Sequence, residues 1–267
     1  MKHLIMLWIA CCLLPLSASA GLPLPIVVYH KVQTEPIRDE PGQTVISLAR
    51  FEAQMRYLAA HRYRTLSMDE VVEATRSGNV PDHAVAIHFD DGWANQKNAL
   101  PILEKLGLKA TFWIIGEALP EVGYLAWDEI RTIARKPLFD VHSHTLTHPC
   151  DESSNLKTWV AGRPAGKSIA DARRELIGSK LLIERQIGMP VRYLAWPCGL
   201  YNDELIGLAI AAGYEALATV DRGLTPTGDV LRIRRAIIDG TCDLDAFVEV
   251  LSSPRNQYPC TTPPDKR

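Results

Sequence analysis

Short apolar runs alternate with longer amphipathic stretches along most of the chain. The apolar runs are four to eight residues long, are rich in valine, isoleucine and aromatic residues, and are typical of buried strands. The sequence predicts strands at Pro25–Tyr29, Ala84–Phe89, Lys109–Ile115, Leu138–Val141, Val191–Ala195, Ala216–Val220 and Leu231–Ile238.

The amphipathic stretches between these runs have the period of helices. In the first of them, apolar residues recur at helical spacing from Leu48 to Leu58. Ser67 followed by Glu70 is typical of a capping box, and Asn202 is a candidate N-cap. Helices are predicted at Ser47–His61, Ser67–Arg76, Ala94–Leu106, Trp127–Arg135, Ser168–Ile187, Asn202–Ala212 and Leu244–Leu251.

Strands and helices that alternate over one chain of this length predict an α/β protein with a parallel sheet, most simply a closed (β/α) barrel. We expect one barrel domain over residues 21–251 and a loose, proline-containing tail over residues 252–267. The polar stretch Cys150–Lys167 is predicted to be a long irregular loop over the site.

The first twenty residues are typical of a secretory signal. A basic start at Lys2 precedes the apolar run Leu4–Leu16, and Ala18 and Ala20 fit a cleavage site after residue 20. The run is shorter than the roughly 20 residues of a membrane span, and no later run approaches that length. We therefore expect an exported protein, periplasmic or extracellular. A lipoprotein anchored at Cys11 or Cys12 stays open as an alternative.

The composition is that of an ordinary globular protein. The chain has 267 residues, is 47% hydrophobic and 22% charged, and carries a formal charge of −2. These values exclude disordered and fibrous proteins and argue against a nucleic-acid partner. The chain does not indicate its oligomeric state.

Four cysteines follow the signal, and an exported protein is expected to oxidise them. Four cysteines allow three pairings. Our hypothesis is Cys150–Cys198 and Cys242–Cys260, because each pair would fall in one region of the barrel.

Polar residues gather where the predicted strands end, which is the edge that carries the chemistry of such barrels. His30, the pair Asp90-Asp91, the segment His142–His148 and the turn Trp196–Gly199 each follow a different strand.

Two of these histidines, His144 and His148, can reach one cation if their segment turns helically. One carboxylate added to them completes a two-histidine, one-carboxylate set, which leaves coordination positions open for water and substrate. The second carboxylate is then free to act as a base.

These segments resemble the motifs of the polysaccharide deacetylases of carbohydrate esterase family 4. Phe89–Gly92 is similar to the first motif of that family, Ser143–Pro149 to the second, and Ala195–Asn202 to the third. The segments Ile26–His30 and Phe51–Met68 resemble the exported branch that includes biofilm poly-N-acetylglucosamine deacetylases. The resemblance implies a distorted (β/α)7–8 barrel.

The resemblance also implies roles for single residues. Asp90 would be the general base, and the metal ligands would be Asp91, His144 and His148. The backbone N–H of Cys198 would help to hold the oxyanion. The implied metal is most simply Zn²⁺, although Co²⁺, Ni²⁺ or Fe²⁺ could occupy the same donors.

The chain departs from the family pattern in three places, and the first is Cys198, which stands where the family usually has tyrosine or phenylalanine. No histidine follows His148, so the usual general acid is missing, and His30 and His142 are candidates to replace it. Ala195 stands where the family has an arginine that orients the base, and the segment 231–235 is basic where the family has its late histidine.

Aromatic residues beside the motifs are candidates for sugar binding, namely Trp93, Trp196 and Tyr201, whereas His88 is expected to be a core histidine. The prediction is a metal-dependent hydrolase that removes N-acetyl groups from an amino-sugar polysaccharide similar to poly-N-acetylglucosamine. Three alternatives remain: a peptidoglycan N-deacetylase, a polysaccharide-binding protein with impaired catalysis, and a hydrolase of small amides or O-acetyl esters.

Overall fold

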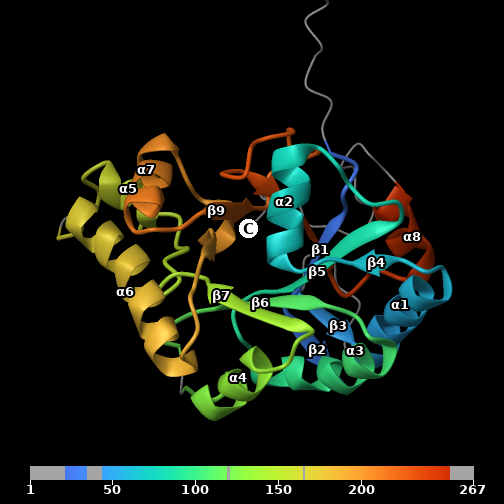
Figure 1. Cartoon of the computed structure of the whole chain (residues 1–267). Helices are drawn as coiled ribbons and strands as arrows, with labels where there is room; N and C mark the ends of the chain where they lie inside the picture. The colour runs from blue at the N-terminus through green and yellow to red at the C-terminus, as the bar shows by residue number, and fades with distance from the viewer. Residues whose placement is uncertain (1–21, 35–43, 119–120, 165, 253–267) are drawn as a thin grey trace, which may run out of the picture.

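A computed structural model describes residues 22–34, 44–118, 121–164 and 166–252 (Figure 1). The predicted signal and all of the predicted tail after residue 252 lie outside this part of the chain. None of the described helices is long and apolar enough to cross a membrane.

Eight parallel strands form a nearly closed barrel, as the sequence predicts. They follow one another around the sheet in the order β10, β9, β8, β7, β6, β5, β1 and β11. Their bounds are β1 (Ile26–Tyr29), β5 (Ala84–Phe89), β6 (Ala110–Ile114), β7 (Phe139–Ser143), β8 (Tyr193–Ala195), β9 (Ala216–Thr219), β10 (Ile233–Arg234) and β11 (Ala236–Ile237). A short strand, β4 (Arg64–Thr65), also pairs with β5, and β2 (Lys31–Gln33) and β3 (Val45–Ser47) form a separate pair.

The barrel closes through the last predicted strand, which is divided in two. Ile233 pairs with Ala218 of β9, whereas Ala236 pairs with Val27 of β1. The chain changes partners at Arg235, so one continuous strand over Leu231–Ile238 is wrong. A buried arginine is thereby placed in the seam between the first and last strands.

Helices surround the sheet (Figure 1). They are α1 (Leu48–Ala60), α2 (Met68–Ser77), α3 (Leu100–Leu106), α4 (Trp127–Ala134), α5 (Leu156–Val160), α6 (Ile169–Ile187), α7 (Asp203–Ala211) and α8 (Leu244–Ser252). The predicted caps are confirmed: Ser67 and Glu70 form a capping box, and the Asn202 side chain accepts from the Leu205 amide.

Two of the helix predictions need correction. The segment 94–106 is a 3₁₀ helix over Ala94–Ala99 followed by α3, because Pro101 has no N–H to continue an α-helical ladder. The predicted irregular loop contains α5, whose first turn is capped by the Asn155 side chain.

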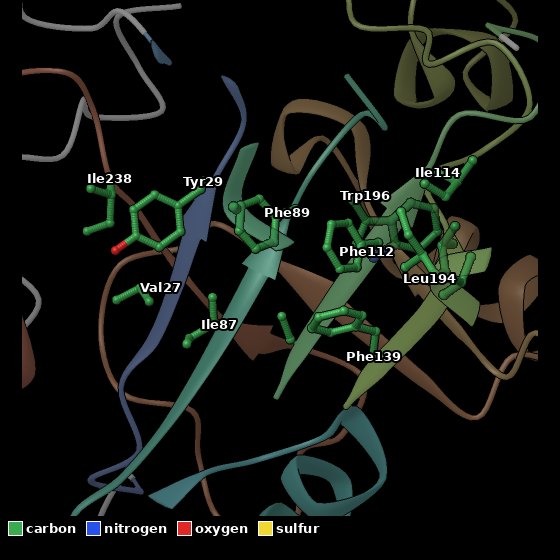
Figure 2. Packing of buried hydrophobic residues seen from close by; sticks show 14 of the residues in the cluster. Val27, Tyr29, Ile87, Phe89, Phe112, Ile114, Phe139, Leu194, Trp196 and Ile238 are labelled. Atoms are coloured by element: carbon green, nitrogen blue, oxygen red, sulfur yellow. The ribbon is translucent and has the colours of Figure 1, made fainter. Parts of the chain in front are cut away.

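The two faces of the sheet pack against different partners. The outward face carries large residues that pack under the helices; for example, Phe89 stacks on Phe112 at 4.9 Å (Figure 2), and Tyr29 meets Phe51 of α1 at 5.1 Å. Several inward positions are alanines, which leave room for Met68 and Val71 of α2. The N-terminus of α2 lies at the amino end of β7 and β8, so the carboxyl ends of the strands are free to form a site.

Candidate active site

The two adjacent aspartates follow β5 at a sharp turn. Asp91 and Gly92 both have left-handed backbone conformations, with φ of 76° and 80°. A Cβ on residue 92 would lie 3.1 Å from the Ile114 side chain, so glycine suits the turn sterically as well. Because the chain reverses there, both carboxylates face the same rim. Gln96 braces the turn by donating to the Asp90 carbonyl oxygen at 2.6 Å.

The two motif histidines lie on a loop after β7. The expected helical turn between them is wrong, since Thr145 is left-handed (φ 68°) and the loop has no helical bonds. The buried Glu175 of α6 fixes the loop instead. Its carboxylate accepts from the backbone amides of Leu146 and Thr147 at 3.0 and 2.8 Å and from the Thr147 hydroxyl at 2.7 Å.

Asp91, His144 and His148 come together as one group of possible metal ligands. Asp91 Oδ1 lies 3.4 Å from His144 Nε2 and 3.6 Å from His148 Nε2. This oxygen is buried and has no hydrogen-bond partner among the described residues. An uncompensated carboxylate oxygen facing two imidazole nitrogens fits a divalent cation.

The protonation of His144 suits metal binding. Burial lowers its pKa to about 4, with the nearby carboxylates acting in the opposite direction. Its Nδ1 lies 2.8 Å from the Ala195 carbonyl oxygen, a contact that assigns the proton to Nδ1. The lone pair of Nε2 is therefore directed at the site, as in many histidine ligands.

Asp90 is held by an arginine that the sequence analysis did not assign. Arg235 Nη1 and Nη2 donate to the two Asp90 carboxylate oxygens at 2.7 and 3.0 Å, and Nε donates to the Thr219 carbonyl oxygen at 3.2 Å. Burial acts to raise the pKa of Asp90, but the Arg235 charge, with help from nearby histidines and from these hydrogen bonds, holds it well below its usual range. Ala195 does replace the arginine of the third motif, but an arginine still binds Asp90, because Arg235 reaches it from the break between β10 and β11.

The two candidates for the general acid occupy different places. His30 is nearly buried at the end of β1, and its charge would lower the pKa of both Asp90 and Asp91. His142 instead packs inside the barrel against Trp113 and Tyr193. Burial lowers its pKa to about 3, so it carries no proton to donate at neutral pH. His142 is therefore a poor acid.

The three predicted sugar-binding aromatics differ in how far they are open to a substrate. Trp196 is 1% exposed and belongs to the core. Trp93 has the Tyr124 ring at 4.3 Å and the Lys31 ammonium at 3.8 Å from its own ring. Tyr201 is partly buried, and its hydroxyl hydrogen-bonds to the Asp221 carboxylate. The expectation of sugar binding is thus wrong for Trp196, whereas it stays a prediction for Trp93 and Tyr201.

A disulfide joins the second and third motif loops. Cys150, two residues after His148, is bonded to Cys198, as hypothesised. Cys198 is left-handed (φ 52°) in the tight turn after β8. Cys260 lies outside the described residues, so the pairing with Cys242 stays a prediction.

Beside the disulfide is a groove of about 520 Å³, lined by Glu152, Asn155, Lys157, Thr158, Arg163 and Asn202 among others.

The protein is an α/β barrel with two histidines and two aspartates at the carboxyl ends of its strands, the edge where barrel enzymes carry their chemistry, and three of the four could hold a metal ion. Sequence comparison narrows this class. The profile of the polysaccharide deacetylase family matches residues 77–217, more than half of the chain, and the protein belongs to that family.

Single relatives agree with this assignment. The chain is 27% identical to YxkH of Bacillus subtilis (strain 168) over 75% of its own length, and it spans 65% of that relative. It is 26% identical to the poly-beta-1,6-N-acetyl-D-glucosamine N-deacetylase of Staphylococcus aureus (strain N315), covering 77% of this chain and 70% of that one.

Solved structures show the same fold. A polysaccharide deacetylase from Bacillus cereus superposes with a TM-score of 0.71 at 25% identity, over 86% of this chain and 69% of that one. IcaB from Ammonifex degensii superposes with a TM-score of 0.70 at 20% identity, over 87% of this chain and 96% of that one.

Proposed function

We propose that this protein is an exported, metal-dependent N-deacetylase of an amino-sugar polysaccharide of the poly-N-acetylglucosamine type. The observation that carries the proposal is the pairing of a three-donor cluster, Asp91, His144 and His148, with a second carboxylate held 3.7 Å from the same His144 nitrogen. A metal in this cluster would polarise the acetamide carbonyl and lower the pKa of water.

The residues around the cluster have complementary tasks. Asp90 would accept the proton of the attacking water, and the Arg235 fork keeps it ionised and correctly oriented. The amide N–H of Cys198 would donate to the developing oxyanion. His30 is the candidate that returns a proton to the leaving amine, because it lies beside both carboxylates.

Substrate class and location rest on separate arguments. The relative from Staphylococcus aureus is named for poly-beta-1,6-N-acetyl-D-glucosamine. The groove beside the disulfide has mostly polar and charged lining residues, which suits hydroxyl-rich sugar units flanking the reacting one.

The signal-like residues 1–20 and the Cys150–Cys198 disulfide both favour an oxidising compartment. Zn²⁺ is the proposed metal, since it prefers this donor set.

The test is acetate release by residues 21–267 after metal loading, with poly-N-acetylglucosamine oligomers and peptidoglycan as separate substrates. We expect acetate from the former and its loss in the Asp90→Asn variant, with the metal still bound. Acetate from peptidoglycan alone would overturn the substrate class. No acetate from either polymer, with metal bound and the fold intact, would overturn the activity.

A further inference from the structure

The two oxygens of the Asp91 carboxylate have different surroundings. Oδ2 accepts a hydrogen bond from the indole Nε1 of Trp93 at 2.8 Å. Oδ1 has no hydrogen-bond partner among the described residues and faces both histidine nitrogens. The carboxylate is therefore already oriented, with one oxygen occupied and the other directed at the cluster.

The indole that makes this bond is held firmly. The Tyr124 ring stacks on it at 4.3 Å and 19°, and the Lys31 ammonium lies 3.8 Å from its centroid. A backbone bridge between Trp93 and Tyr124 fixes the pair further. The Tyr124 ring and the Lys31 ammonium occupy space against the indole that a stacked sugar ring would need, which points to another task for this tryptophan.

We propose that Trp93 is a positioning residue that makes Asp91 a one-oxygen metal ligand. An indole N–H is a donor only, so it occupies Oδ2 without competing for the metal. With Oδ2 engaged by the indole, Asp91 would offer Oδ1 to a bound metal, which would leave room in the site for water or the acetamide oxygen. This inference rests on the metal site of the proposed function and goes beyond it by assigning a residue outside the ligand set.

The test measures metal affinity and not turnover. Metal-free wild type and Trp93→Phe are titrated with Co²⁺, following visible absorption and tryptophan fluorescence. Phenylalanine keeps an aromatic ring beside Lys31 and Tyr124 but removes the N–H. We expect Co²⁺ to bind about 10- to 100-fold more weakly, the range for partners of metal ligands, with an altered visible spectrum.

The chain offers a matched control in Trp159→Phe. The Trp159 indole also donates to a side chain, Ser154 Oγ at 3.0 Å, and also has a lysine ammonium 4.2 Å from its ring. Unlike the Trp93 indole, the Trp159 indole makes no hydrogen bond to a candidate metal ligand. We expect wild-type Co²⁺ affinity in this variant, and unfolding curves check that both variants are folded.

Each outcome is decisive. Wild-type affinity and spectrum in Trp93→Phe would overturn the role of Trp93 while leaving the metal site intact, and so would an equal loss of affinity in both variants. A wild type that binds no Co²⁺ would overturn the metal site itself, and the inference with it.

Discussion

Replacement of Arg235 by methionine should be among the most damaging single changes near the site. The Arg235 side chain is fully buried, and its partner Asp90 is 4% exposed. Methionine fills much of the space but leaves the carboxylate without its two charge-assisted bonds, each worth about 1.5–3 kcal/mol. Breaking a buried ion pair from one side costs about 3–5 kcal/mol, and we expect the free energy of unfolding to fall by that amount.

The assay is urea unfolding of the metal-free protein at neutral pH, together with acetate release by the metal-loaded protein. Arg232→Met is the matched control, because Arg232 is partly exposed and pairs with an Asp203 carboxylate that is 90% exposed. Such a pair contributes about 1 kcal/mol or less. The double variant Arg235→Met/Asp90→Asn should regain stability over Arg235→Met, since the unpaired charge is gone.

The acetate readout separates orientation from stability. In folded Arg235→Met we expect acetate release to fall strongly, because Asp90 loses both its orientation and the charge that keeps it ionised. The reasoning is refuted if Arg235→Met and Arg232→Met unfold at the same urea concentration and release acetate equally well.

Three further outcomes are expected. Burial holds the pKa of His88 well below 6.5, so below pH 6.5 the unfolded chain binds a proton that the folded chain does not. As the pH is lowered from 6.5, the free energy of unfolding should therefore fall by up to about 1.4 kcal/mol per pH unit. Urea unfolding checks this, because the fall should be shallower in His88→Gln. The Cys150–Cys198 disulfide spans a sequence separation of 48, and the double serine variant should lose up to about 4 kcal/mol of unfolding free energy; an unchanged urea midpoint would contradict this. Zn²⁺ at a hundredfold excess over its Kd should stabilise the protein by about 2.7 kcal/mol, and thermal unfolding should show no such shift in His144→Ala.

Much of the fold was predictable because its signals are local. Apolar runs and helical periods depend on neighbouring residues, so the strand Ala84–Phe89 and the caps at Ser67 and Asn202 could be inferred from the sequence. The strand-end rule then predicts that Asp90, Asp91, His144 and His148 lie at one rim. The Cys150–Cys198 pairing followed from the same topology.

What the sequence left open depends on contacts between distant segments. Arg235 meets Asp90 across 145 residues. It can do so because β11, which follows Arg235, pairs with β1, and β1 pairs with β5, the strand that precedes Asp90. Glu175 reaches the histidine loop from a helix, and no local pattern distinguishes it from a solvent-facing acid.

The sequence by itself determined the alternating architecture, since strand and helix periods are short-range properties, and the resemblance of its motifs to the family pointed to Asp91, His144 and His148 as candidate metal ligands. Only the tertiary structure decided that Arg235 binds the Asp90 carboxylate and that the Trp93 indole donates to Asp91. These contacts depend on which distant segments the fold brings together and buries. Packing in the core likewise buries Trp196, which the sequence offered as a sugar-binding residue.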